Sequence, residues 1–240
     1  MDIEEYRKQF IDELRFNAEH EGTEPETQFI EKYLSDLEEI GELNDPIPMS
    51  VEMRGSRNRL LAFDAYAYDE ADGALILIAS DFTNERDSTP TLTNSRIEDI
   101  YTHMLNFLDE CVQGNISKYC DDSDPALIIA NEFRKKIGKG LLSTEILRFK
   151  FFILSNATLS KQVKNLSKPE FLGRPVELNV WTLERFYQTF ASNSSEIIEI
   201  DTTDFGCDGI QCLKADIGVD SEYDAYLGIV PGKFLADIYL

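Results

Sequence analysis

Residues 59–82 read RLLAFDAYAYDEADGALILIASDF, two apolar runs joined by an acidic turn. The first run, residues 59–68, predicts a strand, and the Asp-Gly dipeptide at residues 72–73 is typical of a tight hairpin turn. The second run, residues 74–79, is apolar at every position, as in a central strand that is covered on both faces. These residues therefore predict a β-hairpin in the interior of a sheet.

Two helices are expected before this hairpin, within residues 1–43, because apolar side chains recur there at helical spacing. Thr23 and Pro25 predict the start of the second helix, as its N-cap and its first-turn proline. Gly41 ends that helix. Residues 44–48, which contain two prolines, predict a rigid connector.

Two more helices are expected after the hairpin. In residues 95–112, Ser95 and Glu98 have the spacing of a capping box, and Cys111 falls on the apolar face. A buried, reduced thiol is the ordinary role for such a cysteine. The second of these helices begins at the N-cap Asp124 and stops at Gly138.

Strands and helices then alternate along the chain. Residues 147–154 and 176–181 predict strands, residues 183–190 a helix, residues 197–200 a short strand, and residues 223–232 a strand followed by a turn. This alternation predicts an α/β fold in which a mixed central sheet is flanked by helices and preceded by the two amino-terminal helices.

The net charge of −22 is unevenly distributed. Residues 1–45 carry 15 acidic and 4 basic side chains, whereas residues 134–174 carry 10 basic and 2 acidic ones. The overall charge opposes non-specific binding to nucleic acid. The basic segment either complements the acidic one in the folded protein or forms a phosphate- or partner-binding face, for which the candidates are Lys135, Lys136, Lys139, Lys161 and Lys164.

Composition also bears on the compartment. The chain contains no run of 18 apolar residues that could span a bilayer, and residues 1–5 lack the features of a signal peptide. The four cysteines form no CxxC pair, which is the usual start of a zinc site. We therefore expect a cytoplasmic protein with no membrane partner.

A helix followed by strands that carry acids is the skeleton of a metal-dependent nuclease core. Asp64 stands in the middle of the first hairpin strand, where a buried carboxylate needs a ligand or a donor. Asp81 closes the second strand, and Glu38 or Glu39 could supply an outer acid. An active site of this kind would hold Mg²⁺, and no other cofactor is indicated.

The nuclease pattern is incomplete in the second strand. Counting 15 residues from Asp64 places Ala79 at the carboxylate position and Asp81 at the position of the water-activating lysine. Sliding by two residues places Asp81 and Thr83 there, and no basic residue occurs between Arg59 and Arg86. The alternative is that Asp64 and Asp81 are strand-end residues satisfied by backbone donors in a core without activity.

Three segments resemble the amino-terminal region of the abortive-infection phage-resistance (AIPR) family. They are the hairpin at residues 63–82, the strand–helix unit within residues 151–187, and residues 223–239. The resemblance implies bacterial antiphage defence and a restriction-endonuclease-like, PD-(D/E)xK-type core. This sequence departs from the family pattern at the lysine, where Asp81 stands.

The resemblance also completes the expected organisation. We predict an amino-terminal helical segment at residues 1–45, a nuclease-like core at residues 46–205, and at residues 206–240 the start of a segment leading into a further carboxy-terminal domain. That remainder of the same protein is one expected partner. Nucleic acid, or a phage or host protein, is another, and self-association into a homo-oligomer is left open. Three roles follow: a binding or sensing scaffold with a degenerate nuclease fold, an active Mg²⁺-dependent nuclease of DNA or RNA, or an architectural domain.

Overall fold

The computed structural model describes residues 2–138, 145–160, 170–191, 212–215, 225–228 and 230. The chain forms two compact units, residues 1–192 and residues 193–240. In the second unit, β9 (Cys212–Ala215) pairs antiparallel with β10 (Ala225–Gly228), the latter within the strand predicted at residues 223–232. The strand predicted at residues 197–200 lies outside the described residues. The domain boundaries at residues 45 and 205 stay a prediction.

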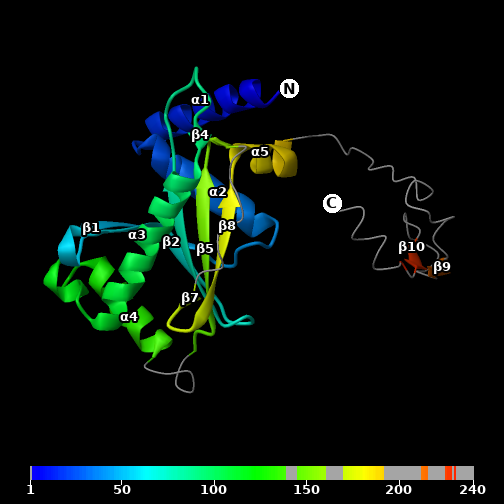
Figure 1. Cartoon of the computed structure of the whole chain (residues 1–240). Helices are drawn as coiled ribbons and strands as arrows, with labels where there is room; N and C mark the ends of the chain where they lie inside the picture. The colour runs from blue at the N-terminus through cyan, green and yellow to red at the C-terminus, as the bar shows by residue number, and fades with distance from the viewer. Residues whose placement is uncertain are drawn as a thin grey trace. The chain divides into compact units, whose positions relative to one another are not determined.

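The first unit is built on a mixed six-stranded sheet in the order β1-β2-β3-β5-β8-β7 (Figure 1). β1, β2 and β3 pair antiparallel, β3, β5 and β8 pair parallel, and β7 returns antiparallel to β8. The prediction of an α/β fold with a mixed central sheet is confirmed. The strands are β1 (Ile47–Arg54), β2 (Leu60–Asp69), β3 (Ala74–Asp81), β5 (Arg148–Ser155), β7 (Glu170–Phe171) and β8 (Arg174–Trp181).

Each face of the sheet has its own hydrophobic core. Helices α3 (Asn94–Gln113) and α4 (Pro125–Ile137) cover one face, and we call their contact the α3/α4 core. Helices α1 (Ile3–Glu21) and α2 (Pro25–Glu39) cover the other, which we call the α1/α2 core. Along β3, Leu75 and Leu77 enter the first core and Ile76 and Ile78 the second. The central, doubly covered strand predicted from its apolar sequence is therefore confirmed.

The helix starts follow local capping chemistry, with two departures from prediction. The N-cap of α2 is Glu24 and not Thr23, whose hydroxyl instead accepts from the Gln28 side chain. The N-cap of α3 is Thr93 and not Ser95, because the Thr93 hydroxyl is the acceptor for the Arg96 amide. The start of α4 is as predicted, since the Asp124 carboxylate accepts from a first-turn amide.

Two elements differ in extent from prediction. The expected rigid connector at residues 44–48 ends earlier, because β1 already begins at Ile47 and pairs with β2. The helix predicted at residues 183–190 is α5 (Leu183–Phe186) followed by a π-helical turn at Tyr187–Ala191. The two-residue strands β4 (Thr91–Leu92) and β6 (Thr158–Leu159) form a separate parallel pair.

Candidate functional site

Asp64 terminates the hydrogen-bonded ladder between β2 and β3. The ladder runs from the Asp69–Ala74 pair to the Ala65–Ile78 pair, and the next β3 amide on that side, Ser80 N–H, donates to Asp64 Oδ2 at 2.7 Å. The Ser50 hydroxyl donates to the other carboxylate oxygen at 3.4 Å. Burial raises the pKa of the Asp64 carboxyl group, and these donors partly oppose the rise.

An irregularity in the strands sets the orientation of Asp64. Residues two apart on a regular strand face the same side, yet Phe63 packs in the α3/α4 core and Ala65 in the α1/α2 core. Opposite this point the register between β1 and β2 shifts, with one extra β1 residue between Pro48 and Val51. Asp64 therefore lies at the bulge, where its side chain can reach the end of β3.

A second carboxylate meets Asp64 at Ser80. The Ser80 hydroxyl donates to Glu26 Oε1 at 3.0 Å, so a single serine contacts two acids. Glu26 occupies the first turn of α2, where a negative charge is favoured by the helix dipole. Sequence reasoning did not select Glu26, because it does not reveal which end of α2 faces the hairpin.

The predicted outer acid, Glu38, lies at the other end of the same helix. It is twelve residues from Glu26, which corresponds to about 18 Å along the helix axis. Its Oε1 accepts from the Asp45 amide at 3.2 Å and so fixes the chain after α2. The alternative acid, Glu39, is the last residue of α2 and is exposed. Glu38 and Glu39 therefore lie at the opposite end of α2 from Glu26, the acid that contacts Ser80.

Asp81 faces the opposite side of the sheet from the Ser80 side chain, because neighbouring residues on a strand point to opposite faces. Its Oδ1 lies 2.8 Å from Nε of Arg96, in the first turn of α3. The buried Ser155 hydroxyl donates to Oδ2 at 3.1 Å. Asp81 is thus bound by protein donors on the α3 side, whereas Ser80 directs Asp64 and Glu26 to the α2 side.

The candidate basic face is described only in part. Lys135 is exposed on the last turn of α4. Lys136 lies over the Tyr68 ring at 4.5 Å and forms an ion pair with Glu145 at 3.2 Å. Lys139, Lys161 and Lys164 lie outside the described residues.

The donor set around Ser80 fits a hard cation only partly. Two carboxylates and a hydroxyl are oxygen donors of the type that Mg²⁺ prefers. Within the described ranges, however, no group of three or more acidic, histidine or cysteine side chains is placed to hold a metal. If Mg²⁺ bound here, Asp64 and Glu26 would hold it, and it would supply charge neutralisation at that face of the sheet.

Taken together, these features define an α/β domain with two amino-terminal helices and a β2–β3 hairpin whose acids are bound to internal donors. The family described as abortive infection phage resistance protein N-terminal domain matches residues 29–188. The chain belongs to this family, as the sequence resemblance predicted. No curated protein and no solved structure matches the chain. No helix among the described residues is long and apolar enough to cross a membrane.

Proposed function

We propose that this region is a binding or sensing module of an abortive-infection phage-resistance protein, built on a degenerate nuclease-like fold. Membership of the family gives the chain its role in phage resistance. The observation that carries the finer proposal is the contact between Arg96 and Asp81. Arg96 forms an ion pair with the carboxylate that a nuclease would use to bind a metal ion. This carboxylate lies on the face of the sheet opposite the Ser80 side chain.

Two further features support a binding module. The hairpin carries no basic residue between Arg59 and Arg86, so no lysine is available there to position an attacking water. Asp64 also stabilises the fold. The β2–β3 ladder ends at the Ala65–Ile78 pair, and the Asp64 carboxylate accepts a hydrogen bond from the next amide on that side of β3, that of Ser80. Asp64 and Asp81 thereby both contribute to the fold itself.

A second candidate function, metal-dependent cleavage of DNA or RNA, is favoured by one observation. Glu26 and Asp64 converge on Ser80 from α2 and β2. A helix acid and a strand acid at one point are part of the expected nuclease pattern. In this alternative, Glu26 takes the place that the sequence analysis gave to Glu38.

The experiment uses the full-length protein in a bacterial host challenged with phage, together with the purified protein. Glu26→Gln and Asp64→Asn each remove a charge but keep a side-chain oxygen that can accept from Ser80. For a binding module we expect both variants to protect against phage like the unchanged protein. The purified protein should not cleave single-stranded DNA, duplex DNA or RNA with Mg²⁺ or Mn²⁺.

Glu31→Gln is the matched control for Glu26→Gln, because Glu31 is an exposed acid of the same helix away from Ser80. Metal-dependent cleavage that is lost in Asp64→Asn but kept in Glu31→Gln, with unchanged circular dichroism, would establish the nuclease instead. Full protection by a protein lacking residues 1–192 would contradict both roles, because neither a sensor nor a nuclease in this unit would then be needed.

A further inference from the structure

A cavity of about 260 Å³ lies between the carboxyl end of α3, the 3-10 turn η2 (Ile116–Lys118) and α4. It is separate from the hairpin acids. Arg96, which contacts Asp81, is in the first turn of α3, whereas Gly114 at the cavity follows the last residue of that helix. Eighteen residues of helix correspond to about 27 Å. The cavity therefore carries its own inference, independent of whether Asp64 or Asp81 binds a metal.

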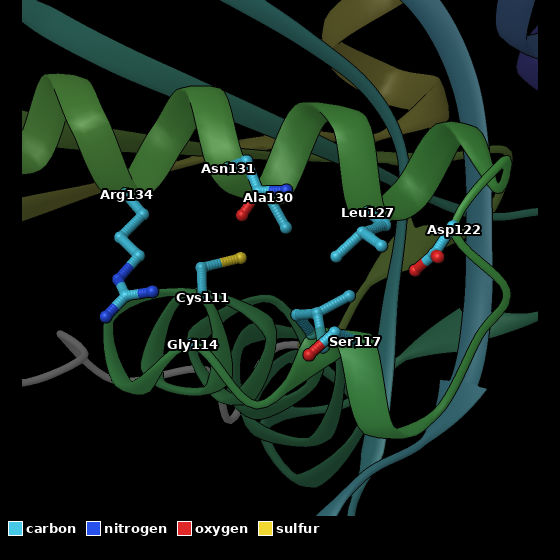
Figure 2. Close-up of a pocket in the computed structure, with 9 residues that line it drawn as sticks. Cys111, Gly114, Ser117, Asp122, Leu127, Ala130, Asn131 and Arg134 are labelled. Atoms are coloured by element: carbon cyan, nitrogen blue, oxygen red, sulfur yellow. The ribbon is translucent and has the colours of Figure 1, made fainter.

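The cavity is apolar in its interior and polar around its opening. Four buried residues line the interior, and four polar residues from η2, α4 and the loop between them complete the lining (Figure 2). The thiol of Cys111 stays protonated, since burial raises its pKa well above the ordinary value. The apolar residues are Cys111, Ile116, Leu127 and Ala130, and the polar ones are Ser117, Asp122, Asn131 and Arg134.

The two charged residues lie at opposite ends of the cavity. Figure 2 shows Arg134 at the end near Gly114 and Asp122 at the other, beyond Leu127. Neither residue forms an ion pair with another described residue. The site thus offers one positive and one negative group to a ligand, separated by an apolar surface.

Gly114 lies directly against the Arg134 guanidinium. It ends α3 in the left-handed conformation, with φ of 72°, which glycine adopts without strain. A Cβ atom at this residue would lie 2.5 Å from Nη1 of Arg134. The guanidinium therefore packs directly on the glycine backbone, near the negative end of the α3 dipole.

We propose that this cavity binds a short extended peptide that carries an anionic group at one end and a cationic group at the other. The anion pairs with Arg134, the cation pairs with Asp122, and an apolar side chain packs between them on Leu127 and Ala130. An extended tripeptide measures about 10 Å. Asp124, two residues after Asp122, is roughly 15 Å along the helix axis from the Arg134 backbone, so the long Arg134 side chain has to close the remaining distance.

The charges favour this ligand over a nucleotide or another polyanion. The protein has a net charge of −22, and Asp122 would face any second negative group at its end of the cavity. A zwitterion satisfies both ends without adding net charge. A free short peptide carries both an anionic and a cationic group. The carboxyl end of a protein chain carries both as well if a lysine or arginine lies close to it. The test below separates these two sources.

The test titrates the full 240-residue chain with the free tripeptide Gly-Leu-Gly, followed by calorimetry and by amide chemical shifts of residues 111–134. We expect saturable binding. Arg134→Gln and Asp122→Asn should each weaken it about tenfold, the usual contribution of a charge-assisted hydrogen bond. A peptide blocked at both ends should not bind. A longer peptide ending in Leu-Gly with a free carboxylate, and carrying a lysine three residues earlier, tests for a chain terminus.

Lys118→Gln and Asp121→Asn are the matched controls. They remove the same charges from exposed neighbouring residues that do not line the cavity, so they should leave binding unchanged. All four substitutions are at exposed side chains, so loss of folding is not expected, and circular dichroism checks this. The proposal is overturned if Gly-Leu-Gly shows no saturable binding at concentrations up to about 10 mM, ten times a Kd of 1 mM. Equal binding by Arg134→Gln, Asp122→Asn and the controls also overturns it.

Discussion

The Arg96 side chain lies 2.8 Å from the Asp81 carboxylate and joins the start of α3 to the end of β3. Arg96 is half exposed, with 51% of its side chain accessible, whereas Asp81 is 18% accessible. Solvent screens an ion pair in such a position, so its contribution to stability is small. The pair matters mainly because it defines which groups the Asp81 carboxylate faces.

We predict that Arg96→Gln lowers the free energy of unfolding by less than about 1 kcal/mol. Ser155→Ala should cost more, about 1–2 kcal/mol, because the Ser155 hydroxyl is buried and also accepts from the Ala157 amide. Urea unfolding followed by circular dichroism measures both values. A larger loss in Arg96→Gln than in Ser155→Ala would mean that the surface pair, and not the buried hydroxyl, holds the end of β3.

Asp64 is expected to show an unusual dependence on pH. Burial raises the pKa of its carboxyl group, so the folded protein binds that proton more tightly than the unfolded chain does. The favourable contribution is complete below the ordinary value of 3.8 and is lost as pH rises through the raised pKa. Asp64→Asn should therefore be closest to the unchanged protein at low pH and gain relative stability towards neutral pH.

The matched variant Asp64→Ala should behave differently. It leaves the Ser80 amide without an acceptor at the end of the ladder, which costs about 1–3 kcal/mol at every pH. Unfolding curves for both variants between pH 3 and pH 7 test this pair of expectations. If Asp64→Asn is as destabilised as Asp64→Ala at pH 7, the charge on Asp64, and not its role as an acceptor, is what the fold requires.

The hairpin was predictable because its two signals are local. An acidic turn and an uninterrupted apolar run identify β2 and β3 from residues 59–82 alone, and the N-cap Asp124 identifies the start of α4. β1 was missed although its signal is also local. Residues 49–54 alternate between apolar and polar side chains, as in a half-buried strand, but the prolines at residues 46 and 48 made the segment resemble a connector.

The arrangement of the acids was not predictable from spacing. Counting residues from Asp64 to Asp81 assumes regular strands, but Phe63 and Ala65 pack on opposite faces of the sheet, opposite the register shift between Pro48 and Val51. The partner of Asp81 is Arg96, fifteen residues later, and only the packing of α3 brings the two together. Such contacts depend on tertiary structure, which periodicity does not encode.

Glu110 should dominate the acid sensitivity of the fold. Its fully buried carboxylate accepts from the Ser56 hydroxyl and amide, from Arg59 at 2.9 Å and from Asn115 at 2.8 Å. Burial alone would raise its pKa, but these hydrogen bonds lower it to about 2. The stabilisation is therefore complete above the ordinary value of 4.5 and is lost as pH falls towards 2.

We predict that Glu110→Gln destabilises the protein by about 2–4 kcal/mol at pH 7, because the charge that Arg59 and Ser56 contact is removed. The difference from the unchanged protein should shrink below pH 4.5 and be smallest near pH 2. Asp109→Asn is the control, since Asp109 also pairs with Arg59 but is 36% exposed. A constant difference across this pH range would show that Glu110 acts by packing and not by charge.

Arg7 connects α1 to the carboxyl ends of β3 and β5, and the residue as a whole is 1% exposed. It donates to the backbone carbonyls of Asn156, Glu85, Arg86 and Thr83, of which Thr83 also accepts from the Asn156 side-chain amide. Arg7→Met keeps the aliphatic volume but removes this donor from the Asn156, Glu85 and Arg86 carbonyls. We expect a loss of about 2–4 kcal/mol and faster hydrogen exchange in α1 and in residues 83–86.

Arg15→Gln is the matched control for Arg7→Met, because Arg15 lies on the same helix and bonds Asn84 in the same loop, but at the exposed surface. Its cost should stay below about 1 kcal/mol, since water replaces an exposed hydrogen bond. The family match begins at residue 29, so α1 lies outside the matched region, and we expect its attachment to depend on Arg7. If Arg7→Met left exchange in α1 unchanged, the apolar contacts of Phe10 and Leu14 would be sufficient to hold the helix on the sheet.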